Sequence, residues 1–146
     1  MSAYLLDTNF FVQSKNSMPM DVFPSFWAEV ADALSSGDAV IHETVERELS
    51  RHKDELVSWT KAISGLIPMK TTAGALLKYA ELCQWAKISA RYTSSAKREF
   101  TDQNRADAWL CAEAAASGLV VVSYERKSNS RNKIKIPDVC DTFGIG

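Results

Sequence analysis

Acidic side chains follow two short apolar segments of this 146-residue chain. Asp7 comes directly after the apolar residues 3–6, and Glu125 comes two residues after the segment 119–123. Apolar runs of this length predict strands that are buried on both faces of a sheet. Ligands of an open parallel α/β sheet bind outside the carboxyl ends of its strands. If the two strands are neighbours, both carboxylates therefore face one crevice.

Two predicted helices add carboxylates near the same edge. Glu43, Glu46 and Glu48 lie near the start of the helix after the second predicted strand, and Asp107 lies in the first turn of the helix before residues 119–123. At about 5 Å and an effective dielectric constant near 20, each pair of carboxylates repels by about 3 kcal/mol. A cation removes this cost, and carboxylates with waters are ligands that suit Mg²⁺ or Mn²⁺. The pattern favours metal-assisted hydrolysis of phosphodiesters.

A basic segment comes directly after Glu125. It contains Arg126, Lys127, Arg131, Lys133 and Lys135. Such a segment is either a solvated loop or a rim that binds nucleic-acid phosphates, and its position favours the rim. The chain has 17 basic and 18 acidic residues, a net charge of -1, but residues 1–60 hold 10 acidic and 4 basic side chains and residues 61–146 hold 8 and 13. The near-zero net charge therefore does not count against an RNA substrate.

The elements that would position these residues alternate along the chain. Strands are predicted over residues 3–6, 39–41, 119–123 and 133–136. Helices are predicted from Phe10 to a break at residues 16–20, from a cap at Asp21 or Ser25 to Leu34, and over residues 42–63, 75–90, 105–117 and 137–143, with residues 92–103 unassigned. Strands separated by helices predict one α/β domain over residues 1–146, in which helices cover both faces of a mainly parallel sheet.

Composition and motifs exclude several other classes of protein. No run of 18 apolar residues could span a membrane, and the N-terminus lacks the basic region of a signal peptide. Cys83, Cys111 and Cys140 have no metal-site spacing and are expected to be reduced thiols of a cytoplasmic protein. The two histidines form no zinc motif, and glycine-rich phosphate loops are absent. The four tryptophans fit helix faces and are expected in the core.

Four ordered segments together resemble PIN domains. Residues 4–11 resemble the opening strand with its Asp-Thr-Asn motif, Glu48-Leu49 the second acidic position, residues 107–112 the third, and residues 119–125 the strand that carries the fourth acid. Residues 13–16, 23–27 and 135–140 look more narrowly like a PIN-like bacterial family known as DUF4411. The resemblance covers nearly the whole chain and implies a PIN-like three-layer α/β/α fold.

The resemblance also implies a function and a site. PIN domains are typically Mg²⁺- or Mn²⁺-dependent ribonucleases, and many bacterial ones are toxins that an antitoxin protein inhibits. The implied metal ligands and catalytic residues are Asp7, Glu48, Asp107 and Glu125. Thr8, Asn9 and Ser123 would orient carboxylates or waters, and Arg126, Lys127, Arg131 and Lys133 would bind RNA. A homodimer is a further expectation, although core packing accounts equally well for the apolar helix face over residues 23–34.

Each of these acidic residues also has a structural alternative. Asp7 could cap the first helix or belong to a turn, although Thr8 and Asn9 could also cap that helix. Asp107 could complete a capping box with Asn104, Glu48 could pair with Arg47, Arg51 or Lys53, and Glu125 could pair with Arg126 or Lys127. Glu125 also departs from the PIN pattern, which has Asp there, and Ser123 replaces Thr. This departure keeps two alternative functions open: a non-catalytic PIN-like module that binds RNA or protein, and an acidic-site phosphatase or DNA nuclease.

Overall fold

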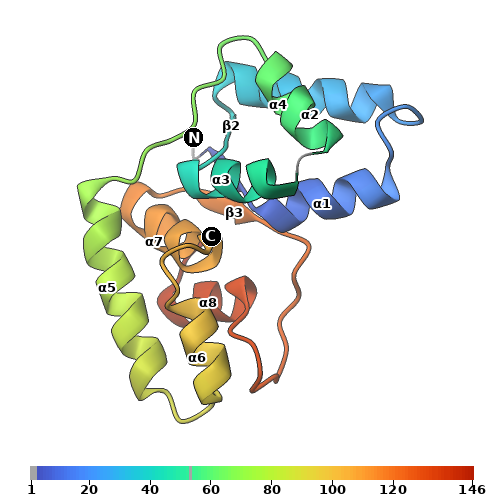
Figure 1. Cartoon of the computed structure of the whole chain (residues 1–146). Helices are drawn as coiled ribbons and strands as arrows, with labels where there is room; N and C mark the ends of the chain where they lie inside the picture. Colours follow the sequence, from blue (N-terminus) through green and yellow to red (C-terminus); the bar gives the residue numbers. More distant parts are fainter. Residues whose placement is uncertain (1–2, 53) are drawn as a thin grey trace.

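The computed structural model describes residues 3–52 and 54–146 (Figure 1). Residues 1–2 and Lys53 lie outside this description. Residues 1–2 belong to the N-terminal segment that was expected to lack a signal peptide. The described residues form three strands, β1 (Tyr4–Leu6), β2 (Ala39–Val40) and β3 (Val120–Val122). They also form eight helices: α1 (Thr8–Ser17), α2 (Pro24–Ser36), α3 (Glu43–His52), α4 (Glu55–Ala62), α5 (Ala73–Ile88), α6 (Ser94–Phe100), α7 (Ala106–Ser117) and α8 (Ile136–Phe143). None of these helices is long and apolar enough to cross a bilayer.

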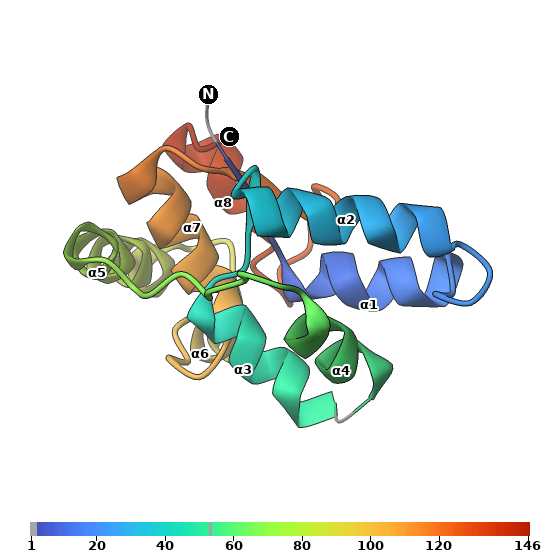
Figure 2. The same cartoon turned by 90° about the horizontal axis from the view of Figure 1, so that it is seen from above.

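The three strands form a parallel sheet in the order β2-β1-β3. Leu5 of β1 is in register with Val40 of β2 and with Val121 of β3. Helices α1, α2 and α4 lie to one side of the sheet, and α5, α6, α7 and α8 lie to the other (Figures 1 and 2). The predicted three-layer α/β/α fold is therefore confirmed. Because the chain runs from β1 to β2 on one side and returns to β3 on the other, the crevice between β1 and β3 is the topological switch point.

Apolar residues from every layer form one core. Leu5 of β1, Phe11 of α1, Val45 of α3, Leu110 of α7 and Val139 of α8 are fully buried. The three cysteines are free, as predicted. This core fixes the helix starts and strand ends that carry the acidic side chains.

The tryptophans pack against other aromatic rings, and the predicted core position is confirmed for Trp27, which is buried, and for Trp59 and Trp85, which pack against the core, but not for Trp109. Trp27 is buried and meets Trp59 edge to face, with ring centroids 5.1 Å apart. Trp85 contacts Phe100, and Trp109 stacks on Tyr79 with centroids 3.7 Å apart. These contacts leave none of the four rings as an isolated stacking platform for a base.

The predicted strand over residues 133–136 is wrong. Residues 133–135 pair with no described strand, and α8 begins at Ile136 with Pro137 in its first turn. Ile134 and Ile136 are both buried, so the alternation reflects an extended segment that packs two isoleucines into the core. Alternation cannot distinguish such a segment from a strand, because only a hydrogen-bonded neighbour makes a strand.

The single helix predicted over residues 42–63 is two helices. Helix α3 ends at His52, and α4 begins after Asp54, whose carboxylate accepts the N–H of Leu56. Asp54 also pairs with Lys15 of α1 at 2.8 Å, and this contact fixes the turn. The unassigned residues 92–103 contain α6, capped by Thr93. The helical spacing of apolar residues continued from α3 into α4 because both helices turn apolar residues, such as Leu49 and Leu56, into the same core.

The predicted helix caps were partly wrong. Asp7 is the N-cap residue of α1, so Thr8 and Asn9 lie in its first turn, and Phe23 rather than Asp21 or Ser25 precedes α2. Gly37 and Gly118 end α2 and α7 with φ of 88° and 68°, a conformation that glycine adopts without a steric penalty.

Candidate metal centre

The ends of β1 and β3 lie side by side, which the sequence left open. The Asp7 N–H donates to the Val122 carbonyl and continues the ladder between the two strands. The Ser123 hydroxyl donates to Asp7 Oδ2 at 2.7 Å and also accepts the N–H of Glu125. Asn9 Oδ1 accepts the N–H of Tyr124. The residues after the two strands are thus tied together, with the Asp7 side chain only 2% exposed between them.

Glu48 joins two further elements to this edge. Its Oε1 accepts the Thr8 hydroxyl at 2.7 Å, and its Oε2 accepts the Ala106 N–H at 2.9 Å. Thr8 follows Asp7 and Ala106 precedes Asp107, so the Glu48 carboxylate holds the chain neighbours of both aspartates. Helix α3 therefore fixes the start of α1 against the start of α7.

Two of the surface pairs considered for Glu48, those with Arg47 and Arg51, do not form. Arg47 instead pairs with Glu43 at 3.3 Å, and Arg51 reaches toward the Asn104 carbonyl. Lys53, the third candidate partner, lies outside the described residues. Helix spacing allowed Arg47 to pair with either neighbouring glutamate. It therefore could not predict that Arg47 pairs with Glu43 while Glu48 turns toward Thr8 and Ala106.

Asp107 lies in the first turn of α7, beside Asp7, Glu125 and Glu48. The N-cap residue is Arg105 and no side chain caps the helix, so the capping box with Asn104 does not form. The Asp107 carboxylate makes no hydrogen bond or salt bridge with any residue that the structure describes. It is a half-buried carboxylate that faces other acids without a bound partner.

The electrostatics of Asp7 and Asp107 follow from this placement. Burial raises the pKa of Asp107 from its ordinary value of 3.8 to about 7, and the negative charges of Asp7, Glu125 and Glu48 add to the shift. Burial raises the pKa of Asp7 to about 6, although the Ser123 hydrogen bond opposes it. Near neutral pH the crevice therefore favours an added proton or cation.

Glu125 lies at the other side of the crevice and is held by the basic segment. Its Oε1 accepts Lys133 Nζ at 3.0 Å, and its Oε2 accepts the N–H of Ile136 at the start of α8. The predicted surface pairs with Arg126 or Lys127 are not formed, and Lys127 pairs with Asp141 instead. The sequence assigned Lys133 to an RNA-binding rim, whereas the structure places its ammonium group against a predicted metal ligand.

The rest of the predicted rim is exposed. Neither Arg126 nor Arg131 forms a salt bridge with a residue that the structure describes. The paired side chains of Lys127 and Asp141 are both largely exposed. The Arg131 carbonyl accepts the N–H of Thr93, which ties this segment to the start of α6.

A comparison with protein families identifies the family of this chain. Residues 4–146 match the sequence model of the domain of unknown function DUF4411. The chain belongs to the DUF4411 family. No curated protein matches it.

The donor set of this DUF4411 protein suits a hard cation, but its geometry is not that of a ready chelate. Within residues 3–52 and 54–146, no group of three or more His, Cys, Asp or Glu side chains is arranged to hold a metal ion. Glu48 and Glu125 already accept hydrogen bonds on both oxygens, whereas Asp107 is unengaged and Asp7 keeps one oxygen free of a described side-chain partner. Asp7 and Asp107 are thus the pair that fits Mg²⁺ or Mn²⁺ most directly.

A hollow with basic walls opens beside Glu48. It has a volume of about 340 Å³ and is lined by Thr8, Glu48, Arg51, His52 and Arg105. Arg105 also pairs with Glu99 at 3.0 Å. These basic side chains could not be grouped from the sequence, because Arg51 and Arg105 are far apart in the chain. They come together only where α3 packs against the start of α7. Their position beside the acids suits an anionic ligand.

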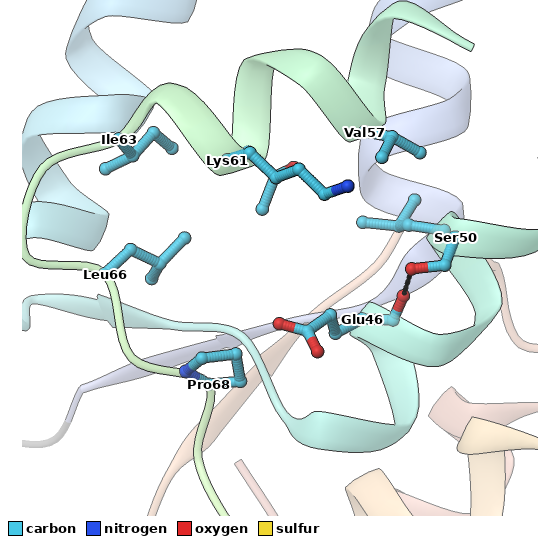
Figure 3. A pocket seen from close by; sticks show the side chains of 9 residues that line it. Glu46, Ser50, Val57, Lys61, Ile63, Leu66 and Pro68 are labelled. Atoms are coloured by element: carbon cyan, nitrogen blue, oxygen red, sulfur yellow. Dashed lines mark hydrogen bonds between the residues drawn. The ribbon is translucent and has the colours of Figure 1, made fainter. Parts of the chain in front are cut away.

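Glu43 and Glu46, the other two glutamates near the start of α3, face elsewhere. Glu43 accepts the N–H of Thr71, and this bond contributes most to a pKa below the ordinary value. Glu46 lines a separate cavity of about 270 Å³ between α3, α4 and residues 63–68, where Lys61 lies on the opposite wall (Figure 3). None of the four predicted ligands lines that cavity.

A buried polar network that the sequence analysis missed fixes α3 against α7. Glu113 of α7 accepts hydrogen bonds from the Thr72 N–H and hydroxyl, from Ser117 and from His42 Nε2. Because His42 Nδ1 accepts the Thr44 N–H, the proton lies on Nε2, and burial lowers the pKa of His42 so that the ring is neutral. Burial raises the pKa of Glu113, but the bonds donated by Thr72 and the other groups outweigh it, so the carboxylate is charged. The sequence feature that could have indicated this network is a glutamate, Glu113, within the Ala-rich helix over residues 106–117.

Proposed function

We propose that this DUF4411 protein is a PIN-type ribonuclease that hydrolyses RNA phosphodiesters with Mg²⁺ or Mn²⁺. One observation carries the proposal. Glu48 bridges Thr8 and Ala106 and thereby brings Asp7 and Asp107, which are 100 residues apart in the chain, to the switch point between β1 and β3. The order of the four acids, and their surroundings, agree with the resemblance of the sequence to PIN domains.

The protein's own residues would bind and orient the reacting groups. Asp7 and Asp107 would hold the cation, which supplies an activated water and stabilises the charge of the leaving oxygen. Ser123 keeps Asp7 oriented through its hydrogen bond, and Glu48 keeps the start of α7 in place. Glu125, held by Lys133, would reach the cation only through a water or after releasing that lysine.

Basic residues on two sides of the acids would bind the RNA backbone. Arg51 and Arg105 line the hollow beside Glu48. The exposed residues Arg126, Lys127 and Arg131 of the predicted rim lie on the segment that follows Glu125. Backbone phosphates between these two groups would pass over the acidic crevice, and their binding would weaken as salt concentration rises.

The biological setting is part of the same proposal. A ribonuclease of this type would act in the cytoplasm as the toxin of a toxin–antitoxin pair, with an antitoxin protein as its partner. A homodimer is a further part of this proposal. None of these assignments is needed for the chemistry at Asp7 and Asp107.

A second candidate function is a PIN-like module that binds RNA or protein without cleaving it. The observation that favours it is the engagement of Glu125 by Lys133 and the N–H of Ile136, together with the lack of a three-residue metal group among the described residues. A carboxylate neutralised by lysine contributes less to binding a cation.

Cleavage assays separate these functions. Single-stranded RNA, single-stranded DNA and a small phosphomonoester are incubated with the wild type, Asp7→Asn, Asp107→Asn and the exposed control Asp141→Asn, with Mn²⁺ or with EDTA. The proposal predicts Mn²⁺-dependent RNA cleavage that is lost in the two site variants and kept in the control. Equal cleavage by all four proteins would refute the site. Tight RNA binding in EDTA without cleavage would support the binding module, and preference for DNA or the monoester would support a DNA nuclease or phosphatase.

A further inference from the structure

An apolar groove lies between α2 and the sheet, and none of the four predicted metal ligands lines it. The groove has a volume of about 250 Å³ and is lined by Tyr4, Leu6, Phe10, Phe26, Glu29, Val30, Ala33 and Ala39. Its lining comes from β1, β2 and the first turn of α1 together with two turns of α2. Tyr4 is 52% exposed there.

The apolar surface continues beyond the groove. Val22 and Phe23, immediately before α2, are 64% and 42% exposed. Helix α2 turns Trp27 and Leu34 into the core, and it leaves Phe26, Val30 and Ala33 only partly covered. A contiguous apolar surface of this kind, bordered by charged residues, marks an interaction site more often than a solvated surface.

The charged residues on and next to α2 have a single sign. Residues 16–46 contain no Lys or Arg, and they contain Asp21, Glu29, Asp32 and Asp38 on and around α2. All four side chains are exposed, and none forms a salt bridge with a described residue. Glu29 lines the groove, and Asp38 lies between α2 and Ala39 at its end.

This charge pattern selects among the possible occupants. A second copy of the chain on a two-fold axis would place the two acidic rims against each other, and the like charges would oppose association. Nucleic acid and anionic membranes carry the same sign as the rim and are disfavoured for the same reason. A cationic partner is attracted by all four carboxylates.

We propose that the α2 groove, defined by its eight lining residues, binds an amphipathic helix with basic flanks from another protein. Apolar side chains one helical turn apart would occupy the channel between α2 and the sheet, in the helix-in-groove mode. Lys or Arg beside them would meet Glu29, Asp32 and Asp38. This surface does not include the acidic crevice, so the inference stands whether or not the protein cleaves RNA.

The test uses a synthetic Leu/Lys amphipathic helical peptide and a Leu/Glu peptide with the same apolar positions. Binding of each labelled peptide to the full chain is measured by fluorescence anisotropy at low and at physiological salt. The wild type is expected to bind the Leu/Lys peptide at least about tenfold more tightly than the Leu/Glu peptide. Equal affinity for the two peptides would overturn the proposal.

Variants distinguish the groove from unspecific attraction. Glu29→Lys with Asp32→Lys removes the net negative charge of the four acids around α2, and Glu81→Lys with Asp141→Lys makes the same change of net charge on α5 and α8. The rim variant should lose about tenfold in affinity for the Leu/Lys peptide, whereas the control should keep it. Equal loss in both variants would refute a specific surface.

A third variant tests the apolar channel itself. Ala33→Trp fills it without altering charge, and it should weaken the Leu/Lys peptide by about tenfold while the circular dichroism spectrum stays native. Unchanged binding would show that only the rim attracts the peptide and would overturn the groove. Sedimentation is run on the same proteins, and a wild-type dimer that Ala33→Trp disrupts would replace the proposed partner with a second copy.

Discussion

Replacing Asp107 by Asn should stabilise the protein while removing a residue of the proposed site. The folded state raises the pKa of Asp107 from 3.8 to about 7 through burial and neighbouring acids. Because the unfolded chain releases this proton near 3.8, the folded state binds more protons between the two values, and its stability falls as pH rises from 3.8 to about 7. Asparagine carries no charge, so the Asp107→Asn protein does not lose folding stability in this way as pH rises.

The magnitude follows from the size of the shift. A difference of about three pKa units at 1.36 kcal/mol per unit gives about 4 kcal/mol at pH 8, where the loss is complete. At pH 5 only about 1.2 units of the interval have been crossed, so the loss of stability has reached about 1.6 kcal/mol. Loss of the favourable interaction between a carboxylate and the start of α7 offsets up to about 1 kcal/mol of the gain.

Urea unfolding in EDTA at pH 5 and pH 8 measures these free energies. Asp107→Asn is expected to exceed the wild type by about 3 kcal/mol at pH 8 and by clearly less at pH 5. The exposed Asp141→Asn should differ little from the wild type at either pH. If Asp107→Asn is no more stable than the wild type at pH 8, or if its advantage does not change with pH, the described crowding of carboxylates is wrong.

Three further predictions concern the cation, the hydrogen bond to Asp7 and the buried network. The rise in melting temperature with Mn²⁺ should grow from pH 5.5 to pH 8, because protons compete with the cation at Asp7 and Asp107, whose pKa values are about 6 and about 7; a shift that does not depend on pH in differential scanning fluorimetry would contradict this. Ser123→Ala removes the hydroxyl that donates to Asp7 and should raise the pKa of Asp7 by about one unit, measured by NMR titration in EDTA; an unchanged pKa would show that the bond is not formed. Glu113→Ala leaves His42 and its other buried donors without their acceptor and should cost about 3–5 kcal/mol in urea unfolding, whereas a loss under 1 kcal/mol would refute the network.

Local features of the sequence were enough to predict most elements and several of their ends. Gly37 and Gly118 stop α2 and α7, and Pro24 occupies the first turn of α2, as their backbone preferences require. The position of Asp7 at the end of a strand was predictable from the run of apolar residues directly before it. Errors arose where one local pattern fits two structures, as with the alternating isoleucines Ile134 and Ile136.

The partners of each acidic side chain were not predictable from spacing. Glu46 and Glu48 are two residues apart on α3, yet Glu46 lines a cavity against α4 and Glu48 binds the start of α7 (Figure 3). Lys133 was expected to contact RNA, but the fold places it against Glu125. Helix orientation within the core decides such contacts, and that orientation depends on packing against residues remote in the chain.

The sequence by itself determined the alternation of strands and helices, the strand end that carries Asp7, the helix start that carries Asp107, and the uneven distribution of charge. These depend on residues close together in the chain. Only the tertiary structure decided that β1 adjoins β3, that Glu48 joins Thr8 to Ala106, and that the acids around α2 surround an apolar groove. The reason is that strand order and helix packing minimise the exposure of the whole core, so contacts between distant residues follow from all of its apolar surfaces together.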